Sequence, residues 1–177
     1  MENENGKQMG KAIRAVLDMH ADCIKLLRDL DKALPEYESL LGNVVALNMG
    51  SSISRRAYLA EGLIRLYVRK GDSSRVLGVN LCFYDENDPT FIEPIMAVAN
   101  TQYLVGPADT QEKLKRGWDP WYAFLAWAPE RLYGEAITID KPAKRSSIEK
   151  TIVAATPLYA IKSLAAATRL IDLVGRP

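Results

Sequence analysis

Apolar residues recur along the first part of the chain at alternating spacings of three and four positions. They are Ile13, Val16, His20, Cys23, Leu27, Leu30 and Leu34, and Leu17, Met19, Ile24 and Leu26 widen the set. This spacing places the side chains on one face of an α-helix, in a heptad arrangement. The pattern predicts an amphipathic helix from about Lys7 to Leu34, which ends because the ring of Pro35 would clash with the preceding turn.

A face as broad as this one favours packing onto a sheet or into a bundle over a lone two-stranded coiled coil. The same face is suited to dimerisation. The sequence leaves open whether the predicted helix packs within its own chain or across a dimer.

Two later stretches alternate apolar and other residues with a period of two, which is the pattern of a β-strand. The first spans residues 58–69 and the second spans residues 75–84. The turn-forming run Gly71-Asp72-Ser73-Ser74 separates them. The sequence therefore predicts a β-hairpin.

Pairing Lys70 with Arg75 would set the register of this hairpin and place Val68 opposite Leu77, so that the apolar faces of both strands coincide. The other face would carry Glu61, Arg65, Arg69, Asn80 and Tyr84, with Arg65 opposite Asn80 and Glu61 opposite Tyr84. The plain interpretation of this face is a solvated surface with a cross-strand ion pair. If helices cover it, it becomes one wall of a polar pocket in which Glu61, Arg65, Asn80 and Tyr84 contact a ligand.

The remaining elements follow from turn residues, caps and shorter patterns. We expect a helical turn over Glu38–Leu41 ending at Gly42, a short strand over Val44–Leu47, a strand within Phe91–Val105, a capped helix over Asp109–Arg116, a helix or strand over 121–127, strands over Glu135–Asp140 and Lys150–Ile161, and a helix capped by Ser163 that runs to Leu173. Strands that mostly meander between terminal helices are typical of the α+β class. The sequence thus predicts one α+β domain over residues 1–177, with an antiparallel meander sheet of about five strands.

Composition narrows the class of protein. The chain has 177 residues, 23 basic and 22 acidic, for a net charge of +1, whereas a nucleic-acid binder usually carries a larger basic excess. Two distant cysteines, Cys23 and Cys82, indicate a reducing compartment rather than a disulfide scaffold. No run of about 18 apolar residues predicts a membrane helix. We expect a cytoplasmic protein that does not enter a membrane.

The residues needed for common catalytic and metal sites are scarce. His20 is the single histidine and lies on the apolar face of the first helix, so it is expected to be a packed or interface residue rather than a metal ligand or a general base. The chain has no phosphate-binding glycine motif and no nucleophile elbow. We therefore assign no catalytic residue, no metal ligand and no cofactor.

Three charged loops offer alternatives to this interpretation. Ser51, Ser52, Arg55 and Arg56 follow Gly50 in a loop that could cradle an anion. Asp85, Glu86, Asp88 and Glu93 could hold a hard cation such as Mg²⁺, although their spacing is not that of a Ca²⁺-binding loop. Lys141, Lys144 and Arg145, with Arg55 and Arg56, form a candidate basic patch. The plain interpretation of such loops is a soluble connector.

All three tryptophans lie in one stretch, which contains Trp118, Trp121, Tyr122, Phe124, Trp127 and Tyr133. Aromatic residues at this density either cover a sheet or form a binding site. We take Trp118, Trp121, Tyr122 and Trp127 as candidate ligand-binding residues.

These observations favour a non-catalytic binding or regulatory module, similar to a sensor domain. It would be homodimeric through the first helix, with a small molecule or a protein as its partner. Two alternatives remain from other classes. One is a Mg²⁺-assisted enzyme that uses arginine with Asp85, Glu86 or Asp88, and the other is a nucleic-acid-associated protein that uses the basic patch.

Overall fold

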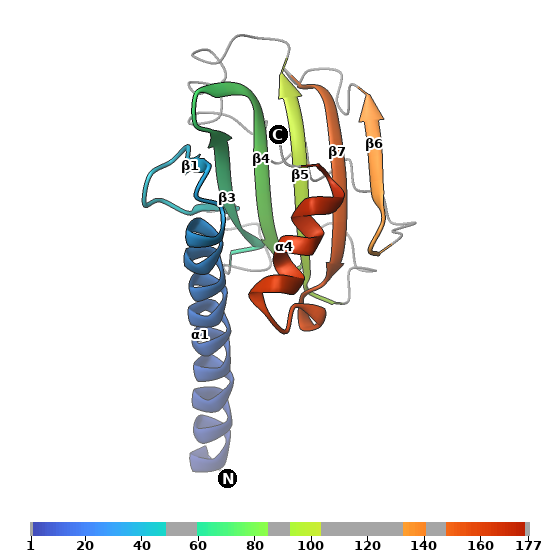
Figure 1. Cartoon of the computed structure of the whole chain (residues 1–177). Helices are drawn as coiled ribbons and strands as arrows, with labels where there is room; N and C mark the ends of the chain where they lie inside the picture. Colours follow the sequence, from blue (N-terminus) through green and yellow to red (C-terminus); the bar gives the residue numbers. More distant parts are fainter. Residues whose placement is uncertain (1, 49–59, 85–92, 104–132, 141–147, 176–177) are drawn as a thin grey trace.

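The computed structural model describes residues 2–48, 60–84, 93–103, 133–140 and 148–175, in which two helices pack on an antiparallel sheet (Figure 1). The elements are α1 (Glu2–Ala33), β1 (Tyr37–Ser39), β2 (Ala46–Asn48), β3 (Gly62–Arg69), β4 (Asp72–Cys82), β5 (Ile95–Tyr103), β6 (Ala136–Asp140), β7 (Ile148–Pro157), the 3₁₀ turn η1 (Leu158–Ala160) and α4 (Leu164–Leu173). The predicted α+β class is confirmed. The predicted helix over Asp109–Arg116 and the stretch 121–127 lie outside the described residues.

The sheet has seven strands in the order β1-β3-β4-β5-β7-β6, and β2 also pairs with β3. Strands β3, β4 and β5 form a meander, whereas β6 precedes β7 in the chain but lies outside it at the edge. The number of strands exceeds the predicted five because the sheet also includes the short strands β1 and β2.

The helical turn predicted over Glu38–Leu41 is wrong: Tyr37 pairs with Arg69, and the amide of Leu40 donates to the carbonyl of Leu66 at 2.9 Å. The open edge of β3 supplies these backbone partners, which an isolated turn lacks.

The predicted hairpin exists, but its predicted register is wrong by one residue. Val68 pairs with Val76, not with Leu77, and Arg65 lies opposite Val79. The turn is tighter than expected: Arg69 pairs with Asp72 around Gly71, whose φ of 82° is favourable for glycine, and the ladder is irregular between Val68 and Arg69. A slip of one residue moves every side chain to the other face of the sheet.

Both faces of this sheet are buried. The predicted hairpin register assumed that only one face is apolar and buried, and this assumption does not hold. Residues of β3 alternate between a cluster shared with the helices, which includes Leu63 and Tyr67, and a second cluster on the opposite face, which includes Ile64 and Leu66. A strand buried on both faces has no single apolar face to align. Its period-two pattern therefore cannot identify the register.

The long predicted helix is confirmed as α1, of 32 residues. Cys23, Leu27, Leu30 and Leu34 are buried in the cluster that α1 shares with the sheet and α4. The N-terminal half of α1 extends past the end of the sheet (Figure 1). No helix in the described part of the chain is long and apolar enough to cross a membrane.

Helix α4 packs beside α1 on the same face, burying Ala167, Leu170 and Ile171. Its predicted cap is confirmed, because the hydroxyl of Ser163 accepts a hydrogen bond from the amide of Ala166 at 3.2 Å. At its other end, the amide nitrogen of Asn100 donates to the carbonyls of Val174 (3.2 Å) and Gly175 (2.7 Å). A β5 side chain thereby holds the C-terminal end of α4 on the sheet.

Removing the cap of α4 tests this part of the fold. We expect Ser163→Ala to lower the free energy of unfolding by about 1 kcal/mol, since an amide of the first turn loses its acceptor. Ser163→Asp keeps an acceptor and adds a favourable charge at the helix N-terminus, so it should retain the stability of the wild type. Urea denaturation measures both variants. Equal losses for the two would contradict the assigned role of the hydroxyl.

Candidate functional site

A cavity of about 570 Å³ lies between α1, the segment that connects β1 to β2, and β3. It is lined by Ile24, Leu27, Arg28, Asp31, Asn43, Val45 and Arg65. This volume lies within the range of small-molecule sites, which combine apolar walls with a few polar groups. We call it the α1–β3 cavity.

A two-point ion pair forms one wall of the α1–β3 cavity. The Nε and Nη2 atoms of Arg65 donate to the two carboxylate oxygens of Asp31 at 3.1 and 2.7 Å, and Nη1 donates to the carbonyl of Val44 at 2.8 Å. The side chain of Arg65 is 6% exposed and that of Asp31 is 34% exposed. Three hydrogen bonds therefore fix the guanidinium plane, and both charges of the pair are balanced.

The electrostatics of Arg65 follow from this geometry. Burial acts to lower the pKa of Arg65, but the hydrogen bond to Asp31 and the charge of that carboxylate outweigh it and raise the pKa on balance. The guanidinium stays charged at every physiological pH. It holds Asp31 and the segment before β2 in place and does not act as an acid.

Tyr67 lies beside this pair on the helix-facing side of β3. It is 1% exposed, and its hydroxyl has no hydrogen-bond partner among the residues that the structure describes. Burial raises the pKa of Tyr67, and the negative charge of Asp31 raises it further. The phenol is neutral, and it has no role as a base.

Two polar groups of the α1–β3 cavity remain available to a ligand. Arg28 and Asn43 are exposed, and Arg28 forms no ion pair among the described residues. With Arg65 balanced by Asp31, the charged lining residues sum to +1. The apolar wall consists of Ile24, Leu27 and Val45. The cavity therefore matches a small molecule with one anionic group and an apolar body.

The four hairpin residues predicted to share one polar wall do not do so. Arg65 lines the α1–β3 cavity, but Asn80 pairs with Ile64 and faces the other side of the sheet. Glu61 is buried next to the start of β3, and Tyr84 follows β4 and is partly buried. The one-residue slip in the register is the physical reason, because it separates Arg65 from Asn80.

The other sequence candidates lie outside the described residues. These are Trp118, Trp121, Tyr122 and Trp127, the anion loop Ser51, Ser52, Arg55 and Arg56, the carboxylates Asp85, Glu86 and Asp88, and the basic residues Lys141, Lys144 and Arg145. Within the described ranges, no three His, Cys, Asp or Glu side chains are grouped as metal ligands.

The sequence patterns gave no prediction for Arg28 and Asp31. Both occupy positions next to the apolar face of α1, one residue after Leu27 and one after Leu30. Charged residues that border an apolar helix face commonly contact the element beneath. That signal was present, but nothing in the sequence showed that Arg65 would lie opposite Asp31.

Comparison of the chain with protein-family models, with curated proteins and with solved structures finds no match. The candidate site therefore rests on its own geometry.

The ion pair predicts a stability effect. We expect Asp31→Ala to lower the free energy of unfolding by about 2 kcal/mol, because it leaves the buried guanidinium of Arg65 without its carboxylate. The loss should stay below that of a fully buried pair, since Asp31 is one-third exposed. Chemical denaturation measures it.

Two variants control this prediction. Asp29→Ala removes a carboxylate of the same helix that pairs with Lys25 at the surface, so it should change stability far less. The double variant Asp31→Leu, Arg65→Met replaces both charges by apolar groups and should recover most of the loss. If Asp29→Ala and Asp31→Ala cost the same, the pair does not stabilise the fold.

Proposed function

We propose that the protein is a non-catalytic binding module that forms a homodimer through the N-terminal half of α1 and takes a small anionic molecule in the α1–β3 cavity. One observation carries the proposal: the apolar face of α1 continues past the sheet, where three of its large side chains are exposed. Met9, Ile13 and Leu17 are 68%, 55% and 60% exposed. They recur every four residues along one side of the helix.

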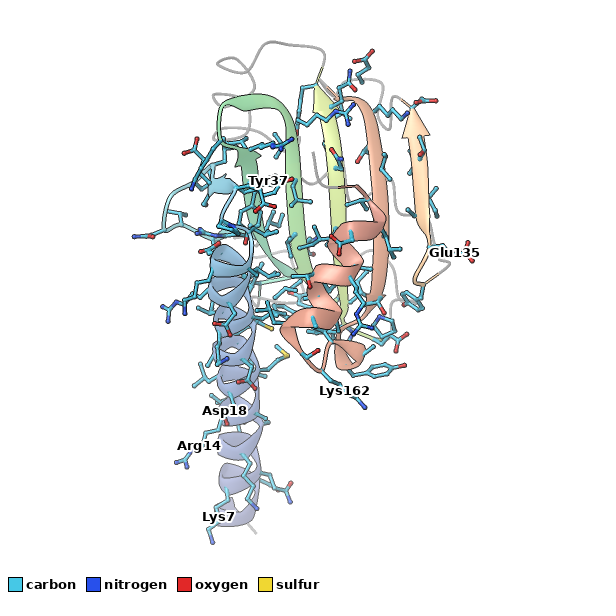
Figure 2. All side chains as sticks on the ribbon, in the orientation of Figure 1. Lys7, Arg14, Asp18, Tyr37, Glu135 and Lys162 are labelled. Carbon is cyan, nitrogen blue, oxygen red and sulfur yellow. The ribbon has the colours of Figure 1, made fainter. Side chains whose placement is uncertain are left out.

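The length of this projection supports an assembly. Full burial of the apolar face begins at Cys23, so most of the 21 residues of α1 that precede it lack support from the sheet. A helix in a protein draws most of its stability from tertiary packing, which this part of α1 largely lacks within its own chain. Contiguous exposed apolar residues are typical of protein interfaces. The opposite face of this part of α1 is charged and carries Lys7, Lys11, Arg14, Asp18 and Asp22, of which Figure 2 labels Lys7, Arg14 and Asp18.

The α1–β3 cavity lies on the same side of the helix as this exposed strip. Ile24, one heptad after Leu17, lines the cavity, and Arg28 follows one turn later. A ligand that orders this side of α1 would therefore favour the paired state of the helix. Ligand binding and assembly are linked in the proposal.

The buried Cys23 and Cys82 thiols form no disulfide within the described part of the chain, which is consistent with a reducing compartment such as the cytoplasm. The two alternative functions gain no support within the described residues, because the carboxylates and basic residues that they need lie outside them.

A charge placed on the strip tests the assembly. We expect Ile13→Asp to convert the dimer into a monomer by native mass spectrometry, because the new carboxylate would be buried without a partner. Ala15→Asp places the same group on the charged side of α1 and should leave the dimer intact. Leu27 is unsuitable for this purpose, since it is buried in its own chain. A wild-type protein that is monomeric at micromolar concentration would refute the proposed assembly.

The fluorescent probe 8-anilinonaphthalene-1-sulfonate, a monoanion with an apolar body, tests the α1–β3 cavity. We expect Arg28→Glu to weaken its binding about tenfold, because the variant removes the available cation and adds a repulsive charge. The control is Arg14→Glu, which makes the same change on α1 outside the cavity. Similar affinities for both variants, measured by fluorescence titration, would place the binding of this anion elsewhere.

A further inference from the structure

We infer that the ligand of the α1–β3 cavity is a monoanion that carries a neutral hydrogen-bond donor, a hydroxyl or an amide N–H, beside its anionic group. The cavity discriminates against the corresponding ammonium compound. This inference rests on the proposed function, which assigns the cavity to a small anionic molecule, and it names the chemical class of that molecule. It follows from the hydrogen bonds of Asp31, from the position of Arg28 and from the charges around both.

The carboxylate of Asp31 can accept more hydrogen bonds than Arg65 donates. Arg65 donates one hydrogen bond to each carboxylate oxygen, at 3.1 and 2.7 Å. The two oxygens of an ionised carboxylate offer about four lone-pair sites, so the ion pair occupies about half of them. Asp31 also lines the cavity, and its side chain is 34% exposed. Asp31 is therefore an acceptor that a bound molecule can reach.

The ligand determines whether this acceptor keeps its hydrogen bonds. Solvent reaches a carboxylate that is one-third exposed, and a ligand that fills the cavity takes the place of this solvent. An apolar group against Asp31 would leave charged acceptor positions unsatisfied, which weakens binding. A hydroxyl or an amide N–H would instead donate to the carboxylate, and such charge-assisted hydrogen bonds are stronger than neutral ones. A donor at this position of the ligand therefore strengthens binding.

The charges around Asp31 favour a neutral donor over an ammonium group. The negative charge of Asp31 is balanced by Arg65, and Arg28 brings a second guanidinium to the same cavity. An ammonium group at Asp31 would have two positive charges and one negative charge as neighbours. It would also lose part of its hydration on entering the cavity. A hydroxyl or an amide N–H makes the same hydrogen bond without these two costs.

The spacing of Arg28 and Asp31 places the two polar groups of the ligand close together. Residues three positions apart on a helix are neighbours, with Cβ atoms about 5–6 Å apart. Arg28 therefore binds the anion next to the donor that Asp31 accepts. A 2-hydroxy acid and an N-acyl amino acid both carry a carboxylate and a neutral donor in this relation. The apolar body of the ligand then contacts Ile24, Leu27 and Val45.

Asn43 lines the cavity from the segment before β2, and hydrogen bonds on its neighbour hold that segment in place. The amide of Val44 donates to the carbonyl of Leu41 at 3.1 Å, and the carbonyl of Val44 accepts from Arg65 at 2.8 Å. The carboxamide of Asn43 has donor and acceptor atoms, so it suits either polar group of the ligand. A wall that is fixed before the ligand arrives lowers the entropic cost of binding.

Three molecules with the same carbon skeleton test this class. 3-Phenyllactate has a hydroxyl beside its carboxylate, 3-phenylpropanoate has no polar group there, and phenylalanine has an ammonium group. Each displaces 8-anilinonaphthalene-1-sulfonate from the protein in a fluorescence titration, and both enantiomers of 3-phenyllactate are measured. We expect the better enantiomer of 3-phenyllactate to bind about tenfold more tightly than 3-phenylpropanoate, because its hydroxyl donates to Asp31. Phenylalanine should bind more weakly than both, because its ammonium group is repelled.

The double variant Asp31→Leu, Arg65→Met removes the acceptor and keeps Arg28. It should still bind 3-phenylpropanoate and should lose the preference for 3-phenyllactate. The matched control is Asp29→Ala, which removes a carboxylate of the same helix that pairs with Lys25 at the surface, and it should keep the preference. A preference that survives in the double variant would overturn the role of Asp31. The titration of the wild-type protein does not depend on the folding of either variant.

The outcomes separate this inference from the function on which it rests. Equal affinities for 3-phenyllactate and 3-phenylpropanoate, both weakened by Arg28→Glu, would overturn the inference and leave the anion-binding cavity standing. Phenylalanine as the tightest ligand would overturn it as well. Displacement of the probe by none of the three at millimolar concentration would also overturn it. If Arg28→Glu then left the affinity for the probe unchanged, the proposed cavity itself would be wrong.

Discussion

The packing of the C-terminal half of α1 on the sheet is the contact on which the rest of the structure depends. Leu27, Leu30 and Leu34 are buried against residues of β3, β4 and β5 and against α4. Burial of each such side chain contributes about 1.5–3 kcal/mol. The same contact sets the position of α1 along the sheet and places Asp31 next to Arg65. It also forms the α1–β3 cavity between the helix and β3.

This contact also divides one amphipathic face into two parts with different environments. The part after Cys23 is core, and the part before it extends past the sheet. The residues on the two parts are of the same kind, since both carry branched or long apolar side chains at helical spacing. The difference lies in where the sheet ends. Where this face extends past its own sheet, Met9, Ile13 and Leu17 remain exposed.

The burial of both faces of the sheet explains why the predicted hairpin register was wrong while other predictions from the sequence succeeded. The long helix, the β5 and β6 strands and the cap at Ser163 were confirmed, because each depends on residues close together in the chain. The hairpin was also found, but not its register. Alternation reports one buried face, whereas β3 is buried on both. The tight turn at Gly71 then decided the pairing, and the expected wall of Arg65 with Asn80 was lost.

The sequence by itself determined the α+β class, the C-terminal end of α1 and the identity of its apolar face, because local spacing and capping specify these through the geometry of a single element. It identified Arg65 as a candidate ligand-binding residue, but it placed Arg65 on the same face of the sheet as Asn80, whereas the two residues lie on opposite faces. Only the tertiary structure decided that Asp31 meets Arg65, that Arg28 borders a cavity, and that Ile13 is exposed while Leu27 is buried. The physical reason is that these properties depend on contacts between residues far apart in the chain, and on where the sheet ends beneath the helix.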